Sequence, residues 1–165
     1  MAWSVNPNEP AAMFEGPVVE NCLAILTRDF KEALDYYYAG EDLPDFDERT
    51  LGPPLRNTFP CLAVEPRTNR VEESSDRSHV VEVVRIRLFM AVTADGPSKV
   101  TELIMKYVRV AHLVLQTARR DFFTGMSNPF EVVLGFEHAY DVVRSNDTII
   151  SRAGAIEVTV SLRER

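Results

Sequence analysis

The chain has 165 residues, of which 45% are apolar, enough to form one hydrophobic core without the help of metals or disulfides. Its 18 Lys and Arg residues against 25 Asp and Glu residues give a formal charge of −7, which opposes general binding to nucleic acid. The two cysteines, Cys22 and Cys61, are too few for the disulfide framework of a small secreted domain. They are expected to be buried free thiols in a reducing, intracellular setting.

The first 17 residues differ in composition from the rest of the chain. They hold three prolines and a glycine and show little apolar periodicity, which predicts an extended arm followed by a single domain over residues 18–165. Trp3 and Phe14 lie on this arm, and each is expected to pack either on its own domain or on a neighbouring protein. The arm does not resemble a signal peptide, and no run approaches the ~20 apolar residues of a membrane span.

The first regular element predicted is a helix over residues 18–39, where apolar residues recur at intervals of three and four. Residues 41–58 mix acidic residues with proline and glycine, and this composition predicts a loop without regular structure. A short strand is expected over residues 59–65, closed by Pro66. The polar segment 67–78 that follows is expected to be a long hairpin loop.

Residues 80–93 show the clearest strand pattern in the chain. Apolar residues alternate there with Arg85 and Arg87, so the two arginines are expected on the opposite face of the strand, toward solvent or an interface. After a turn, a wide apolar stripe predicts a second helix that starts at residue 98 and ends near Asp121.

Two final strands are predicted over residues 131–144 and 154–162, with the polar segment 145–153 as the turn between them. The element order is then helix, two strands, helix, two strands. Because the paired strands have short or hairpin connections, the sequence predicts an α+β fold. Its sheet is expected to be mostly antiparallel, with about four strands and both helices packed on one face.

No residue pattern in the chain is typical of an enzyme active site. There is no glycine-rich phosphate loop, no GxSxG elbow and no HExxH or CxxC motif. Asp45 and Asp47 alternate as in a calcium loop and Glu48 follows closely, but Pro44, Phe46 and Leu51 interrupt the required ligand spacing, so a solvated acidic loop is expected. The three histidines are far apart in the sequence and are expected to be ordinary hydrogen-bonded or exposed side chains. The sequence therefore predicts no catalytic residue, metal site or cofactor, and a function in assembly or binding.

Two groups of charged residues on predicted loops are candidates for contacts between subunits. The acidic group is Asp45, Asp47 and Glu48, and the basic group is Arg67, Arg70 and Arg77. Arginine holds carboxylates through paired hydrogen bonds, so separated patches of opposite charge suit head-to-tail association into rings or filaments. Charges scattered for solubility alone are the alternative interpretation.

Several segments, taken in order, carry a likeness to a known family. They are the helix VVENCLAILTRDFKEAL, the strand FPCLAVEP, the strand HVVEVVRIRLFMAV with its DGPSKV turn into a helix, and the strands EVVLGFEHAYDVV and AGAIEVTVSL. In order and pattern these segments, which cover residues 18–163, resemble the tail terminator (tail completion) proteins of long-tailed bacteriophages and related neck proteins.

This resemblance implies a structural virion protein and not an enzyme. The family forms a ring, usually a hexamer, that caps the tail tube, stops its polymerisation and joins it to the head. The implied partners are further copies of the chain, the tail tube protein and head-completion or connector proteins, with no membrane. Part of each sheet lines the channel in such rings, so Arg85 and Arg87 are candidates for that surface, past which DNA moves without sequence-specific binding. The implied location is the virion tail or neck, after assembly in the host cytoplasm.

Two other functions are compatible with the sequence. The best alternative is a small adaptor or regulatory module that binds a peptide or small ligand in a pocket between helix and sheet. The run from Tyr36 to Tyr38 favours a contact surface, because consecutive helical positions point about 100° apart and at least one ring must be exposed or at an interface. A weaker alternative is an enzyme that uses the carboxylates between Glu41 and Glu48 with a divalent metal.

Overall fold

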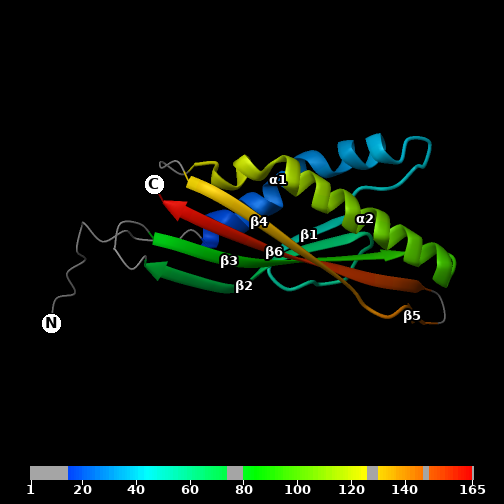
Figure 1. The fold of residues 1–165 in the computed structure, drawn as a ribbon. Helices are drawn as coiled ribbons and strands as arrows, with labels where there is room; N and C mark the ends of the chain where they lie inside the picture. The colour runs from blue at the N-terminus through cyan, green and yellow to red at the C-terminus, as the bar shows by residue number, and fades with distance from the viewer. Residues whose placement is uncertain (1–14, 74–79, 126–129, 147–148, 165) are drawn as a thin grey trace.

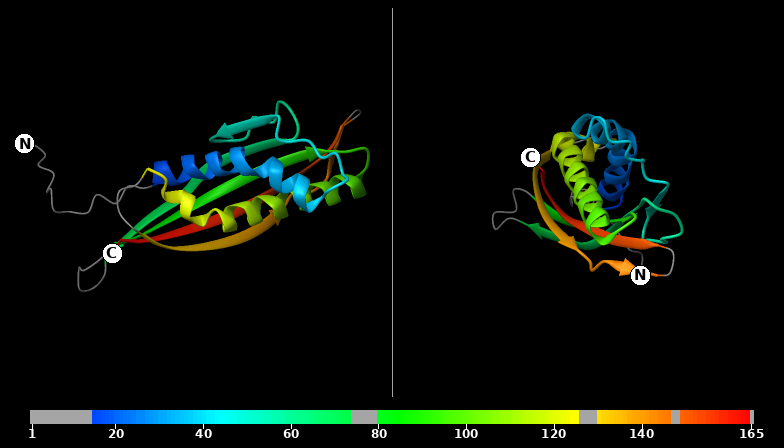
Figure 2. Two further views of the ribbon diagram at one scale, coloured as in Figure 1. Left: turned by 90° about the horizontal axis from the view of Figure 1, so that it is seen from above. Right: turned by 90° about the vertical axis from the view of Figure 1, so that its right-hand side faces the viewer.

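The computed structural model describes residues 15–73, 80–125, 130–146 and 149–164. These residues form two layers: a long twisted sheet, and a pair of helices that lie along one of its faces (Figures 1 and 2). The elements in chain order are α1 (Glu15–Tyr37), β1 (Glu48–Leu51), β2 (Cys61–Glu73), β3 (Val80–Thr93), α2 (Pro97–Thr117), the 3-10 helix η1 (Arg119–Phe123), β4 (Phe130–Tyr140), β5 (Arg144–Ser145) and β6 (Ile150–Glu164).

The sheet has the strand order β1-β2-β3-β6-β4, and the short strand β5 pairs with β6. Every neighbouring pair is antiparallel except β1 and β2, which run parallel. The predicted α+β class, with a mostly antiparallel sheet and both helices on one face, is therefore confirmed. The described residues form six strands, however, where about four were expected.

Both helices form where apolar residues recur every three or four positions. α1 buries Cys22, Leu26 and Phe30 along one stripe, and such a stripe stabilises a helix mainly through its packing on the rest of the fold. The chain leaves α1 through Gly40, whose φ of 94° is a conformation that glycine adopts without strain. α2 begins at Pro97, whose ring fixes a φ suited to the first helical turn. Among the described residues no helix is long and apolar enough to cross a bilayer.

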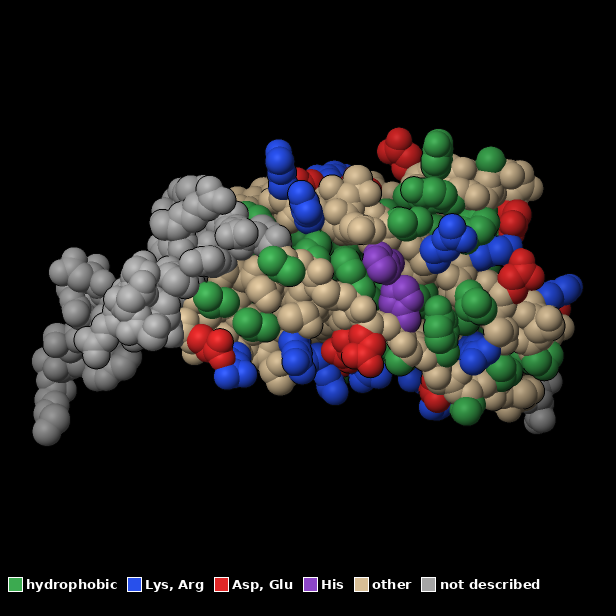
Figure 3. Space-filling model, viewed as in Figure 1, with side chains coloured by type: hydrophobic (Ala, Val, Ile, Leu, Met, Phe, Trp, Pro, Cys, Tyr) green, Lys and Arg blue, Asp and Glu red, His purple; other side chains and the backbone are tan. Residues whose placement is uncertain are grey.

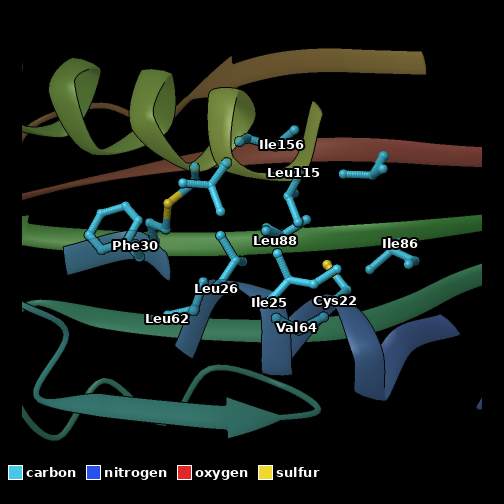
Figure 4. Close-up of a cluster of buried hydrophobic side chains, with 14 of the residues drawn as sticks. Cys22, Ile25, Leu26, Phe30, Leu62, Val64, Ile86, Leu88, Leu115 and Ile156 are labelled. Carbon is cyan, nitrogen blue, oxygen red and sulfur yellow. The ribbon is translucent and has the colours of Figure 1, made fainter. Parts of the chain in front are cut away.

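The core lies between the helices and the inner face of the sheet. Ile86 and Leu88 of β3 and Ile156 of β6 are completely buried there, and Figure 4 shows them among side chains from both helices and from β2. Burial of each such side chain contributes about 1.5–3 kcal/mol relative to leaving it exposed. The core therefore holds the two layers together.

An aromatic cluster closes the core where the segment after α1 crosses it. The ring of Phe46 lies 4.4 Å from that of Phe30 and 5.4 Å from that of Tyr107 in α2. The Tyr107 hydroxyl donates a hydrogen bond to the carbonyl of Pro44, which satisfies the one polar atom of a buried ring. The loop after α1 is thereby fixed to α2.

α2 and β6 approach each other closely at Gly154. A Cβ atom at this position would lie 2.8 Å from Cγ2 of Val108 and 3.0 Å from Cγ1 of Ile104. Both distances are shorter than ordinary carbon contacts of about 3.5–4.0 Å. The absence of a side chain at Gly154 is thus what allows α2 to lie directly on the sheet.

The prediction that residues 41–58 contain no regular element is wrong. β1 forms within this segment and pairs in parallel with β2, from Glu48 opposite Cys61 to Leu51 opposite Val64. The backbone amide of Gly52 extends the ladder by donating to the Val64 carbonyl at 2.8 Å. Four residues are too short for a periodic signal, so the pairing with β2 decides their conformation.

The prediction that a strand ends at Pro66 and that 67–78 is a loop is also wrong. β2 continues to Glu73, with an irregular register between Pro66 and Thr68. Because β1 has already ended there, proline lies on an open strand edge where it breaks no ladder bond, and the extra residue forms a bulge. Arg67 and Arg70 therefore lie on a strand and not on a loop. The predicted turn is shorter too, since β6 begins at Ile150.

Candidate functional site: the open face of the sheet

The sheet face turned away from the helices, here called the open face, carries the two arginines that the sequence singled out. Arg85 and Arg87 alternate along β3 with the buried Ile86 and Leu88, so strand geometry places them on the opposite side. Arg85 is exposed and Arg87 is half-buried. The predicted separation of apolar and basic residues on β3 is present in the structure.

Arg87 sits in a row of charged residues that crosses the sheet. Glu65 of β2, Arg87, Glu157 of β6 and Glu137 of β4 are register partners in turn. Arg87 lies 3.8 Å from Glu65 and 3.7 Å from Glu157, and Arg67 reaches the same two carboxylates at 4.0 Å. The row ends at the sheet edge with Glu137 directly beside Glu157, and no ion pair of Glu137 is found within the described residues. Such partly exposed pairs contribute little to stability, typically ~0–1 kcal/mol each.

Arg85 lies over a shallow hollow in the open face. The hollow has a volume of about 490 Å³ and is lined by Arg67, Thr68, Glu137 and Glu157 among others, with Gly135 leaving one position without a side chain. No ion pair or hydrogen bond of the Arg85 guanidinium is found in the described part of the chain. This cation is therefore available to an anionic group of a partner.

The other end of the open face is covered by the segment between β1 and β2. A small cluster of buried residues lies there, and Phe59 packs against it. The guanidinium of Arg56 lies 4.5 Å from the ring centroid of Phe89, within the range of a cation–π contact. The open face thus has an apolar end under this segment and a charged end that the described residues leave uncovered.

The acidic loop does not gather its carboxylates at one point. Asp45 pairs with Arg49 at 2.5 Å, and Glu48 accepts hydrogen bonds from the amides of Asn57 and Thr58 at 3.2 and 3.3 Å. Asp47 is exposed. Within the described ranges no three His, Cys, Asp or Glu side chains come close enough to hold a metal ion. These contacts hold the loop in place and do not favour the metal-dependent alternative.

Both cysteines are buried free thiols, as predicted. Burial raises the pKa of the Cys22 thiol far above its ordinary value, and burial also raises the pKa of Cys61. A protonated thiol is a poor nucleophile. The cysteines therefore act as core residues.

Two histidines that are 26 positions apart in the sequence lie in contact. Nδ1 of His112 in α2 is 2.9 Å from Nε2 of His138 in β4, and the His112 ring stacks on Phe136 at a centroid distance of 4.1 Å. Burial and the neighbouring His138 both lower the pKa of His112. Figure 3 shows the histidine atoms between the helix layer and β4. The pair joins an edge strand to the helix that covers it.

The helix layer has its own exposed feature, a groove between α1 and α2. Its volume is about 370 Å³, and its lining includes Ala33, Tyr36, Tyr37, Leu113 and Val114, with Asp29 and Glu32 at its acidic side. The side chain of Tyr36 is 78% exposed and that of Tyr37 is 49% exposed, so the expectation of exposed tyrosine rings is confirmed. This groove lies between the helices and not between helix and sheet.

The arm residues Trp3 and Phe14, together with Arg77 of the predicted basic group, lie outside the described residues. The contacts expected of them therefore stay predictions. No protein-family model matches the chain, and no curated protein matches it.

Proposed function

We propose that this chain is a structural virion protein, a tail terminator or neck subunit that assembles into a ring around a channel lined by the open face of its sheet. The observation that carries the proposal is the contrast between the two faces. Helices seal one face, whereas the charged end of the other, with Arg85 and Arg87, is uncovered by any described residue. A ring that directs all open faces inward gives this surface a use.

The charge pattern of the open face suits the passage of DNA without its capture. Arg87 is held between two carboxylates, and among the side chains of this face that the structure describes only Arg85 offers a cation without a partner. Because binding to a polyanion grows with the number of phosphates neutralised, one such cation per subunit gives weak and sequence-independent contact. The overall charge of −7 further opposes tight binding.

The proposal assigns other surfaces to protein partners. The two rims of the ring, formed by the loops at the strand ends, would meet the tail tube on one side and a head-completion or connector protein on the other. Such a subunit would act in the virion tail or neck after assembly in the host cytoplasm. It would need no cofactor and would catalyse no reaction.

Light scattering combined with negative-stain imaging, at two protein concentrations, tests this proposal. A closed ring of uniform mass in the images is the expected result. Open filaments, or a monomer that also fails to bind purified tail tube ends, would contradict it. Particles carrying Arg85→Ala with Arg87→Ala should assemble but lose genome passage or retention, and unchanged infectivity would remove the channel role of these two residues.

The groove between α1 and α2 favours the second candidate, a small adaptor or regulatory module. Apolar and aromatic side chains line a concave surface of about 370 Å³, within the size range of ligand sites. A saturable thermal shift with an aromatic or basic peptide, abolished by Tyr36→Ala, would support this function. A monomeric chain that shows such a shift would replace the ring proposal.

A further inference from the structure

The groove between α1 and α2 is an apolar surface that the described residues leave open. Ala33 of α1 and Leu113 and Val114 of α2 line it, and the ring of Tyr36 beside them is largely exposed. An exposed apolar surface with polar residues at its rim usually marks a place where another group binds. The group that fits this lining must itself carry a large apolar side chain.

The N-terminal arm carries side chains of this kind. Trp3, Met13 and Phe14 lie among residues 1–14, which precede α1 and lie outside the described residues. The sequence left two places open for them, their own domain or a neighbouring protein. An aromatic side chain buries about 150–250 Å² where it packs, so exposure of both the arm and the groove to water would be unfavourable. The arm is therefore the first candidate for the occupant of the groove.

The length of the arm decides which of its side chains can reach the groove of the same copy. Ala33 lies 18 residues after Glu15 in α1, which is about 27 Å along the helix axis. Trp3 lies 12 residues before Glu15, and a stretch of that length spans up to about 40 Å. Phe14 adjoins α1 and is too near its start to reach Ala33. Trp3 reaches the groove with length to spare for a reversal of the chain.

One side of α1 leads from the start of the helix to the groove. Asn21, Arg28 and Glu32 follow one another at intervals of seven and four residues, so they share this side. Asn21 and Arg28 bond to η1, and Glu32 lines the groove. Glu9, the one charged side chain among residues 1–14, lies half-way between Trp3 and the start of α1. An arm on this path would therefore bring Glu9 near the Arg28 cation before it reaches Glu32.

The chemistry of the groove suits a tryptophan. Its ring would pack on the apolar lining and beside Tyr36, and aromatic pairs add to the stabilisation from burial alone. The indole N–H needs an acceptor when it is buried. The carboxylates of Asp29 and Glu32 line the same groove, and no ion pair of Glu32 is found in the part of the chain that the structure describes. The groove thus offers both an apolar surface and an acceptor for the N–H.

We propose that the N-terminal arm folds back along α1 and places Trp3 in the groove of its own copy. The tether keeps Trp3 near the groove at an effective concentration on the order of millimolar, whereas a second copy has to arrive by diffusion. Tyr36 lies at the rim and keeps its outer edge in solvent. The groove is then occupied by the chain itself, so a peptide ligand of the adaptor function would have to displace Trp3.

Trp3 is the only tryptophan of the chain, so tryptophan fluorescence reports on this contact alone. In the unaltered chain we expect emission at a shorter wavelength than that of tryptophan in water, and acrylamide quenching several-fold weaker than in Leu113→Arg. That substitution puts a cationic side chain into the groove beside Asp29 and Glu32. Ala33→Phe, which fills the groove from α1, should also expose Trp3. Met105→Arg, at a position of α2 that is 52% exposed and outside the groove, should change neither signal.

Three results would overturn the proposal. Emission and quenching typical of a solvent-exposed indole in the unaltered chain would mean that Trp3 does not pack. A shielded indole that neither groove variant exposes, while circular dichroism shows both to be folded, would place Trp3 elsewhere. Shielding that disappears on dilution would assign Trp3 to the groove of a neighbouring copy.

The length of the arm gives a second test that leaves the groove unaltered. Deletion of residues 4–11 leaves Trp3 four residues before Glu15, a span of at most about 14 Å, so Trp3 should be quenched as strongly as in Leu113→Arg. Replacement of residues 4–11 by the same number of glycine and serine residues keeps the reach and should keep Trp3 shielded. Shielding that survives the deletion, or that is lost from both variants, would contradict docking through Trp3.

Discussion

The two faces of the sheet are built from alternate residues of the same strands, yet their environments are opposite. On β3, Leu88 is completely buried beneath the helices, whereas the side chain of its neighbour Arg87 is 36% exposed between two carboxylates. The helix-covered face holds apolar contacts that cannot change without loss of stability. The charged end of the open face holds weak, partly exposed ion pairs that can be exchanged for contacts with a partner. The fold therefore depends on one side of these strands for its stability, and we propose that assembly uses the other.

The sharpest test of this difference uses neighbouring positions on β3. Leu88→Ala removes a buried side chain from the core and should lower the free energy of unfolding by about 2–5 kcal/mol. Arg85→Ala removes an exposed side chain from the open face and should change it by no more than about 0.5 kcal/mol. Urea unfolding followed by circular dichroism measures both. Similar costs for the two substitutions would mean that the faces do not differ as described.

The two strand glycines give a second test with one chemical change. An added Cβ at Gly154 would lie 2.8 Å from Val108 beneath α2, whereas one at Gly135 would lie 3.7 Å from Cβ of Thr159 on the open face. Gly154→Ala should therefore cost about 1–3 kcal/mol through overpacking. Gly135→Ala should be near neutral because a contact of 3.7 Å is ordinary. A greater loss of thermal stability for Gly135→Ala than for Gly154→Ala would reverse the comparison.

A smaller loss of stability is expected when Arg87 is removed from the row of charged residues that crosses the open face. Arg87→Ala leaves Glu65 and Glu157 without their shared cation, but the side chains are 19% and 35% exposed and water compensates much of the loss. We expect a cost of about 1 kcal/mol or less, which decreases as salt is added because exposed charges are screened. Unfolding at low and high salt measures it. A cost of several kcal/mol that persists at high salt would place Arg87 among the core residues.

The smallest expected effect concerns pH, at the junction of the two layers. The folded-state pKa of His112 is lowered by burial and by His138, so folding favours the neutral imidazole. Its contribution is complete above the unfolded pKa of about 6.5 and is lost as pH falls through the lower folded value. The melting temperature should therefore decrease on acidification in this range, and less so in His138→Gln. Equal decreases in the two proteins would exclude the histidine pair as a cause.

The sequence was sufficient to predict a helix or strand where its apolar pattern repeats over many residues of that element. The alternation around Leu88 and Arg87 predicted both faces of β3, and the stripe through Cys22 and Phe30 predicted α1 and its buried side. Together with hairpin connections between strands, these patterns predicted the α+β class. The two-layer arrangement could be predicted because each element has one apolar face that another layer must cover.

The remaining features depend on contacts between distant parts of the chain. β1 is too short to have a periodic signal and exists because β2 lies beside it. β2 passes through Pro66 because proline costs little on an open edge, so the composition of 67–73 was misleading. His112 and His138 lie on two correctly predicted elements, but their contact at 2.9 Å depends on how α2 crosses β4. No pattern local to either residue contains that information.

The most direct test of the inward-facing open face is the accessibility of single cysteines in the assembled protein. Arg85→Cys lies on the open face and Tyr36→Cys on the helix layer, and the native thiols are buried. In the assembled sample both should react with a small maleimide, but only Tyr36→Cys should react with a large polymer-linked maleimide, while both should react with it after dilution to monomers. Equal reaction of the two assembled variants with the large reagent would contradict a ring with the open face turned inward.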